Sequence, residues 1–269
     1  MDRLDFERLD RAERRRLLKE DEAWIGKPLS ANPPRREAEA HVRHLALVLR
    51  DTGVEHRAVQ AATYAGDLFD ATVAQQKTGA VACGKGCFHC CTKLVMVTLP
   101  DIFRLAQSFE GKADKIAEIT AAAQIAHAIT HTQAPDDKLP CPVLTDQACS
   151  AYGNRPIPCR FLLSQSLDAC VRIFELGSGE AFPYTAGTVM VRQRLDQIVQ
   201  AALILSGLAP YHYELIQALA VAVTTENAEA RWLAGAPLFA GIAVNAKDFQ
   251  NSGPGAAAEK MAADLRPTI

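Results

Sequence analysis

The sequence has no cysteine in its first 82 residues and none in its last 99, although the chain of 269 residues contains eight. All eight cysteines therefore lie between Cys83 and Cys170. Cysteines placed at random would rarely gather in one third of a chain, so the clustering requires a local cause. The thiols therefore have a role in the central part of the chain and not in its ends.

The sequence also lacks an excess of charge of either sign. It has 29 Lys and Arg against 31 Asp and Glu, which gives a formal net charge of −2 and an isoelectric point of about 6.4. A strongly basic surface for nucleic acid is therefore absent, and we expect no nucleic-acid partner. Hydrophobic residues form 49% of the chain and charged residues 22%, which excludes disorder of the whole chain.

No hydrophobic stretch is long enough to cross a bilayer. The longest, residues 233–244, is interrupted by Gly235, Pro237 and Gly241. The N-terminal residues alternate acidic and basic side chains without an apolar core, so we expect no secretory signal. We therefore predict a cytoplasmic protein with no membrane partner. Because thiols stay reduced in the cytoplasm, the clustered cysteines favour metal or redox chemistry over disulfides.

Common nucleotide-binding and hydrolase motifs are missing as well. The sequence has no Gly-Lys-Ser/Thr phosphate loop and no Gly-x-Ser-x-Gly nucleophile elbow. The segment from Gly177 to Gly179 has neither a preceding strand nor a third glycine, so it is not a dinucleotide loop. No catalytic residue can be assigned on these grounds, and the sequence leaves open whether the protein is an enzyme.

The pattern of apolar residues and helix-boundary signals predicts a mainly α-helical protein with an irregular cysteine-rich centre. Helices are expected over residues 2–22, 36–51, 55–77, 101–109, 112–132, 161–176, 188–206 and 210–234. Residues 93–99 predict one short strand or a buried extended segment, and residues 134–160, with five prolines, should be irregular. We therefore expect short β segments at most.

These elements predict four parts of the chain. They are an N-terminal helical region at 1–78, a cysteine-cluster domain at 79–175, a C-terminal helical region at 176–248 and a flexible tail at 249–269. The tail is rich in Gly and Ala, which favours fraying at a chain end.

The first group of cysteines places four thiols within nine residues, at Cys83, Cys87, Cys90 and Cys91. Cys87 and Cys90 have the Cys-x-x-Cys spacing, which lets two sulfurs face one ion while nearby backbone N–H groups donate to them. Cys90 and Cys91 are adjacent, and their side chains diverge in an extended backbone. They can serve two centres, or one of the two is not a ligand.

The second group consists of Cys141, Cys149 and Cys159, with prolines close to the first and the last. Prolines stiffen the backbone, so less entropy is lost when a metal binds. Cys170 follows eleven residues later among apolar residues of a predicted helix, either as a ligand or as a plain buried thiol.

Other side chains near the cysteines are candidates for supporting roles. His89 can replace a thiolate as a ligand or be a polar loop residue. His127 and His131 have the i, i+4 spacing that can bind zinc, but no Glu follows His127, so the metalloprotease pattern is absent. We interpret the two as a surface or half-buried pair.

Tyr152, Arg155 and Arg160 lie beside the second group of cysteines. In one interpretation they brace the loop through hydrogen bonds to carbonyl and thiolate groups. In the other they tune the thiolates or recognise an anion. The sequence favours neither interpretation.

Taken together, these residues resemble the CxxCxxCC cysteine-cluster family, also called YkgJ-like, whose domain chelates zinc or iron. The resemblance covers about residues 79–175 and rests on Cys83/Cys87/Cys90/Cys91, the apolar segment 94–99 before a helix, Cys141-Pro142-Val143-Leu144, Cys149 with Tyr152, and Arg155-Pro156 with Cys159-Arg160. One spacing differs, because three residues separate Cys83 from Cys87 where the family name has two.

The resemblance implies a metal-chelating protein whose metal is structural or carried, and the expected partner is a metal ion. Some relatives are flagellin lysine N-methylases that use an iron–sulfur cluster and S-adenosylmethionine. The alternative is therefore an iron–sulfur-dependent enzyme that modifies protein side chains, although the sequence has no Gly-rich strand–turn–helix segment to hold S-adenosylmethionine.

Zinc and iron–sulfur clusters both suit sites made of thiolates alone. The Cys141-Pro142 dipeptide and the methylase relatives favour iron–sulfur slightly. We predict all eight cysteines as metal ligands: Cys83, Cys87, Cys90, Cys91, Cys141, Cys149, Cys159 and Cys170. The two groups hold seven, so either Cys170 or His89 completes a second four-ligand site, or one site stays open.

Overall fold

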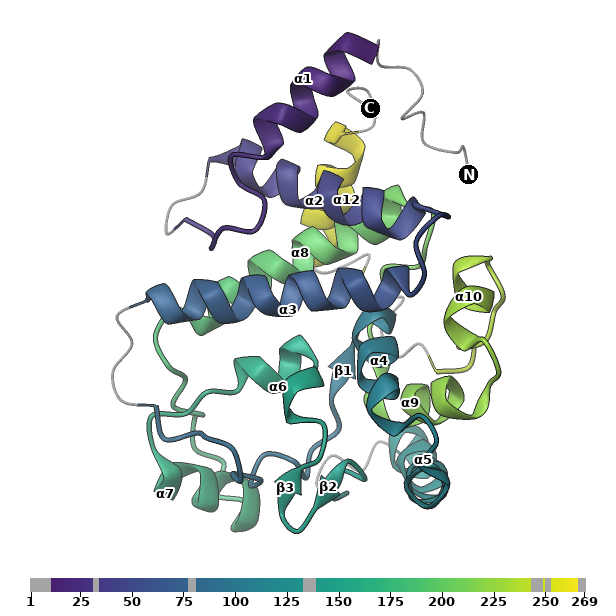
Figure 1. Cartoon of the computed structure of the whole chain (residues 1–269). Helices are drawn as coiled ribbons and strands as arrows, with labels where there is room; N and C mark the ends of the chain where they lie inside the picture. The colour runs from purple at the N-terminus through teal and green to yellow at the C-terminus, as the bar shows by residue number, and fades with distance from the viewer. Residues whose placement is uncertain are drawn as a thin grey trace. The chain divides into compact units, whose positions relative to one another are not determined.

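The computed structural model describes residues 11–30, 34–76, 81–132, 139–242, 249 and 253–265 (Figure 1). Within these residues the protein is mainly α-helical and its strands are two residues long, which confirms the predicted fold class. None of the helices described there is long and apolar enough to cross a membrane.

The chain forms two compact units, and each combines segments that are distant in sequence. The first unit consists of residues 1–75, 190–211 and 245–269, and the second of residues 76–189 and 212–244. The predicted cysteine-cluster domain at 79–175 falls inside the second unit. The predicted boundaries of the four parts stay a prediction.

The first unit is helical. It contains α1 (Arg11–Asp21), α2 (Arg35–Arg50), α3 (Arg57–Gln75), most of α8 (Thr188–Leu205) and α12 (Gly253–Leu265). Helix α2 packs against α3, and α1 packs against α2. On α3, Ala58, Ala61, Ala62 and Ala65 are all buried, at the i, i+3, i+4, i+7 spacing of one helical face. This periodicity is why the sequence predicts α2, α3 and α8 with nearly the observed limits.

The C-terminal segment differs from the expected flexible tail. Helix α12 occupies 253–265, and Ala258, Ala262 and Leu265 on one face of it are buried. The glycines and alanines of this segment therefore provide a small-residue helix face as well as chain flexibility.

A buried polar network connects α1 to α2 in the first unit. The Arg43 guanidinium binds the Asp21 carboxylate through two bonds, Nη2 to Oδ1 at 2.5 Å and Nε to Oδ2 at 2.7 Å. Nearby, Nδ1 of His41 lies 2.6 Å from the Tyr64 hydroxyl. Burial lowers the pKa of His41 to about 4, because the charged imidazolium loses its hydration.

Acidification from pH 7 to pH 5 is expected to lower the free energy of unfolding by about 2 kcal/mol through His41 alone. The pKa of His41 is about 4 in the folded protein and 6.5 in an unperturbed histidine. Between these values the unfolded chain binds the additional proton. The protonation of His41 therefore leaves the free energy of unfolding almost unchanged above pH 6.5 and lowers it as the pH drops towards 4.

Urea unfolding of the wild type and of His41→Gln at both pH values tests this effect. The variant cannot titrate at this position, so its loss of stability on acidification should be smaller by about 2 kcal/mol. Equal losses in the two proteins would contradict the prediction.

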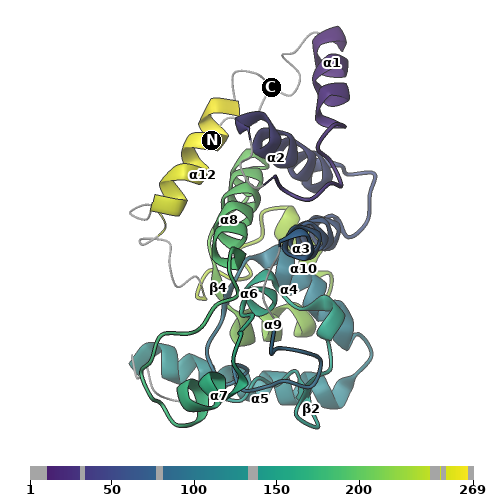
Figure 2. The same cartoon turned by 90° about the vertical axis from the view of Figure 1, so that its left-hand side faces the viewer.

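The second unit has helix α9 (Leu215–Thr224) at its centre. Its other helices are α4 (Leu99–Ala106), η1 (Gln107–Phe109), α5 (Ala113–Thr132), α6 (Ile157–Phe161), α7 (Leu167–Cys170), the π-helix η3 (Val171–Glu175) and α10 (Ala228–Leu233). Helix α9 packs against both α5 and α4 (Figures 1 and 2). The centre of the Phe103 ring on α4 lies 5.3 Å from the centre of the Trp232 ring on α10. These contacts form an apolar core beside the cysteine-rich segments.

Two small antiparallel sheets complete the second unit. Strand β1 (Met96–Val97) pairs with β4 (Tyr213–Glu214), and β2 (Leu144–Thr145) pairs with β3 (Ala148–Cys149). Asp146 and Gln147 between β2 and β3 have φ of 50° and 59°, as the type I′ hairpin turn requires. The segment expected to be irregular thus contains a short hairpin, and the strand expected at 93–99 is shorter than predicted.

Two predicted helices are wrong because local capping interrupts them. Residues 162–166 separate α6 from α7, where the hydroxyl of Ser166 accepts the Ala169 N–H at 3.2 Å and begins a new helix. The helix expected at 210–234 is divided into β4, α9 and α10. The Glu214 carboxylate caps α9 by accepting two backbone N–H groups, and Asn227 adopts a left-handed conformation before α10.

Candidate metal centre

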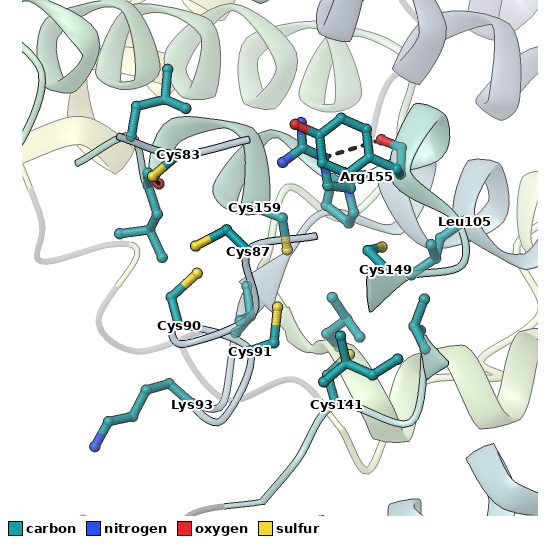
Figure 3. A pocket seen from close by; sticks show the side chains of 18 of the residues that line it. Cys83, Cys87, Cys90, Cys91, Lys93, Leu105, Cys141, Cys149, Arg155 and Cys159 are labelled. Atoms are coloured by element: carbon teal, nitrogen blue, oxygen red, sulfur yellow. Dashed lines mark hydrogen bonds between the residues drawn. The ribbon is translucent and has the colours of Figure 1, made fainter. Parts of the chain in front are cut away.

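The two groups of cysteines converge on one cavity in the second unit. The cavity has a volume of about 80 Å³ (Figure 3). Its cysteine lining residues are Cys83, Cys87, Cys90, Cys91, Cys141, Cys149 and Cys159. Apolar side chains, among them Val95, Leu105 and Leu215, form the walls, and Arg155 and Lys93 contribute positive charge.

Cys170 does not line the cavity. It lies at the end of α7, where its side chain is buried, and it interacts electrostatically with the thiols of Cys83 and Cys87. All eight cysteines fall within the described residues, and all are free thiols. Every cysteine predicted as a ligand is therefore close to the cavity or to one of its lining thiols.

Two successive turns shape the first group of cysteines. The N–H of Cys87 donates to the Gly84 carbonyl at 3.1 Å, and the N–H of Cys91 donates to the Phe88 carbonyl at 2.8 Å. Gly86 has a φ of 96°, a conformation that other residues rarely adopt. Gly86 therefore permits a tight turn here, and the two turns bring the thiols together.

Backbone hydrogen bonds connect the two groups directly. The N–H of Cys141 donates to the Cys91 carbonyl at 2.8 Å, and the N–H of Leu139 donates to the Thr92 carbonyl at 3.2 Å. Cys91 and Cys141 are 50 residues apart in sequence, and these two bonds place them beside each other in space.

Residues that the sequence analysis missed hold the second group in place. Lys115 on α5 donates to the carbonyls of Pro142 and Leu144, both at 3.3 Å. The Ser150 hydroxyl donates to the Val143 carbonyl at 2.6 Å. These contacts join segments through their tertiary positions, and no local sequence pattern indicates them.

Backbone N–H groups also donate to four of the thiol sulfurs. Ser164 donates to Cys83 at 3.1 Å, and similar bonds run from His89 to Cys87, from Val143 to Cys141 and from Ala151 to Cys149. Each bond favours the thiolate and lowers the pKa of the thiol that accepts it. Such bonds orient metal-bound sulfurs and stabilise their negative charge.

Burial acts in the opposite direction. It raises the pKa of Cys83, Cys87 and Cys149, and it raises the pKa of Cys141 to about 11. Burial followed by the charges of neighbouring thiols raises the pKa of Cys159. These five thiols therefore keep their protons at neutral pH until a cation displaces them, and metal binding should release protons.

The arginines beside the second group have different roles. Nε of Arg160 donates to the Arg155 carbonyl at 2.7 Å, and its Nη2 binds the Gly153 carbonyl, so Arg160 braces the loop. The Arg155 guanidinium lies over the Tyr152 ring, 3.6 Å from its centre, and borders the cavity. Its positive charge lowers the pKa of Cys83, Cys90 and Cys149. Each of the two interpretations thus fits one arginine.

The candidate histidines have partners other than the thiols. Nδ1 of His89 lies 2.5 Å from the Glu175 carboxylate, and His89 does not line the cavity. Nδ1 of His127 lies 3.1 Å from Oε1 of Gln217, so this histidine connects α5 to α9. The side chain of His131 lies outside the described residues.

The donor set fits zinc or iron, which thiolate ligands favour. In the described part of the chain, no three Cys, His, Asp or Glu side chains already converge on the position of one ion. The thiols surround a space instead.

The comparisons with known proteins agree with this donor set. Residues 82–174 match the family model CxxCxxCC, described as "Putative zinc- or iron-chelating domain". The match covers about a third of the chain and contains all eight cysteines. No curated protein and no solved structure matches the chain. The resemblance predicted from the cysteine motifs is confirmed, and residues 82–174 are similar to a metal-chelating domain.

Proposed function

We propose that this protein binds an iron–sulfur cluster through the cysteine thiolates of the cavity. The observation that carries the proposal is a cavity of about 80 Å³ bordered by seven thiols. Four thiolates around one zinc ion need no such space, because their sulfurs lie about 3.5–4 Å apart around an ion held at about 2.3 Å. A [4Fe–4S] cluster binds each of its four thiolates at a different iron, so its ligands surround a larger volume.

The surroundings of the thiols support the same proposal. Apolar walls limit water, four backbone N–H groups donate to sulfurs, and Arg155 supplies a positive charge beside them. Hydrogen bonds, burial and nearby charge are the factors by which proteins set the potential of a cluster. When bound, the cluster would supply one-electron redox chemistry. The thiols must be reduced to bind it, which is in line with the predicted cytoplasmic location.

Metal analysis of anaerobically purified protein tests the proposal. We expect equal amounts of iron and acid-labile sulfide, with a broad absorption band at about 400 nm that bleaches on reduction with dithionite. Protein stripped with a chelator provides the baseline. Colourless protein with stoichiometric zinc would contradict the cluster and support zinc sites, and protein without either metal would contradict chelation itself.

A further inference from the structure

We infer that the eight cysteines form two adjoining four-thiolate sites. The first site consists of Cys83, Cys87, Cys90 and Cys170, and the second consists of Cys91, Cys141, Cys149 and Cys159. The inference rests on the proposed function in so far as the thiols bind metal, but it holds for zinc as well as for clusters.

The directions of the side chains separate the two sites. In Figure 3 the sulfurs of Cys83, Cys87 and Cys90 gather on one side of the cavity. The other four labelled cysteines, Cys91, Cys141, Cys149 and Cys159, lie towards the opposite side. Cys90 points towards Cys87, whereas its neighbour Cys91 points towards Cys159. Adjacent residues thus point towards different groups.

Two connections place Cys170 with the first site. The N–H of Ser164 donates to Cys83, and the Ser164 hydroxyl donates to the carbonyl of Ser166, the residue that caps the helix ending at Cys170. On the other side, His89 binds Glu175 at 2.5 Å, at the end of the π-helix that follows Cys170. The buried thiol is therefore held between segments that also carry Cys83 and Cys87.

The electrostatic contacts agree with this placement. The thiol of Cys87 interacts with those of Cys83, Cys90 and Cys170, and the thiol of Cys83 interacts with those of Cys170 and Cys90. Cys170 therefore supplies the fourth thiol that the first site lacks among the residues lining the cavity. The histidine alternative loses support because His89 binds a carboxylate.

The second site is built on the hairpin and on the hydrogen bonds between the two groups. The β2–β3 hairpin holds Cys149 opposite Leu144, close in sequence to Cys141. The bond from the Cys141 N–H to the Cys91 carbonyl places the backbone of Cys91 beside this group, and the Cys91 side chain points towards Cys159 in Figure 3. The thiol of Cys159, on α6, interacts electrostatically with those of Cys141 and Cys149. The four residues of the second site therefore come from three segments and lie towards one side of the cavity.

The two sites share a border at Cys90 and Cys91, whose thiols are hydrogen-bonded to each other. Cys90 also interacts with Cys141 and Cys159, so the two groups lie close together. Arg155 acts on thiols of both groups, Cys83 and Cys90 in the first and Cys149 in the second. A positive charge in this place reduces the repulsion between two anionic centres.

Four thiolates satisfy one zinc ion or one cubane cluster, so the division accounts for all eight cysteines. It makes a sharp prediction about adjacent residues. Cys90→Ser should remove the metal of the first site, and Cys91→Ser that of the second, so each variant should retain about half of the wild-type metal. Lys85→Ala, at an exposed position of the same loop, should retain all of it.

Double variants distinguish two sites from one. Cys87→Ser with Cys170→Ser alters only the first site and should again retain about half of the metal. Cys149→Ser with Cys170→Ser alters both sites and should retain almost none. Iron, zinc and sulfide per chain are measured after anaerobic purification, with circular dichroism as the check of folding. Retention of all metal in Cys170→Ser, or identical losses in both double variants, would overturn the division.

A titration of the wild type keeps the inference testable where variants fail to fold. Metal-free, reduced protein is titrated with Co²⁺, whose thiolate charge-transfer bands report ligation by sulfur. We expect two equivalents per chain, and saturation at one equivalent would overturn the two-site arrangement. The proposed iron–sulfur function fails separately, if the purified protein contains zinc or no metal while the titration still gives two equivalents.

Discussion

Removal of the bound metal is expected to release residues 139–161 from their fixed structure while α9 keeps its packing against α5. This segment buries few large apolar side chains, chiefly Leu139, Val143, Ile157 and Phe161, and has short β and helical elements. Its order therefore depends on the thiol contacts more than on a hydrophobic core. Amide hydrogen exchange in the segment should become faster by about 100-fold, which corresponds to about 2.7 kcal/mol of lost local stability.

Hydrogen exchange with mass spectrometry on loaded and chelator-stripped protein measures this change. Peptides from α5 and α9 serve as the internal control, and their exchange should stay within a few-fold of the loaded protein. Equal exchange of residues 139–161 in both states would contradict the prediction. Equal acceleration throughout the second unit would show that the metal stabilises the entire unit and not this segment alone.

Replacement of Leu219 by alanine is expected to lower the free energy of unfolding of the second unit by about 3–4 kcal/mol. Leu219 lies on α9, has no solvent-exposed surface, and belongs to the helix that packs against both α4 and α5. Truncation removes buried apolar contacts and leaves a cavity that the neighbouring helices fill only in part. Urea unfolding of wild type and variant, followed by circular dichroism, measures the difference.

Ile125→Ala is the matched control for this substitution. Ile125 lies on α5, one of the helices that α9 contacts, but 54% of its surface is exposed. Its truncation should therefore change the stability by about 0.5 kcal/mol or less. If Leu219→Ala were as mild as the control, α9 would not be the centre of the apolar core.

The long helices could be predicted because their apolar periodicity spans several turns. Helix α3 buries small or apolar residues from Ala58 to Phe69 at helical spacing, and the predicted and observed limits agree within two residues. The interruptions could not be predicted in the same way. They depend on single caps, such as Ser166 before α7 and Glu214 before α9, and on the left-handed conformation of Asn227. A capping side chain has the same local signature whether or not the chain turns there.

The candidate site was predictable in composition and not in arrangement. Seven cysteines in two groups and Cys170 nearby, with Cys-x-x-Cys spacing and neighbouring prolines, indicate that the thiols bind metal. The path of the chain after α5 decides which thiols face each other. No local sequence pattern indicates that path. The roles of Arg155 and Arg160 could not be predicted for the same reason. The Arg160 guanidinium binds carbonyl groups, whereas the Arg155 guanidinium borders the cavity, and only the path of the chain decides this.

The packing of α5 against α9 also changes the entropy of metal capture. A flexible loop from Cys91 to Cys141 would contain about 50 residues, and its closure by a metal would cost about 3–4 kcal/mol. With α5 docked, its last residue, Thr132, is only nine positions before Cys141 in the sequence. The closure cost then falls by about 1.5 kcal/mol, which corresponds to about a tenfold gain in affinity. Helix α5 therefore raises the affinity of the second group of thiols for metal by restricting the chain, although none of its described residues lines the cavity.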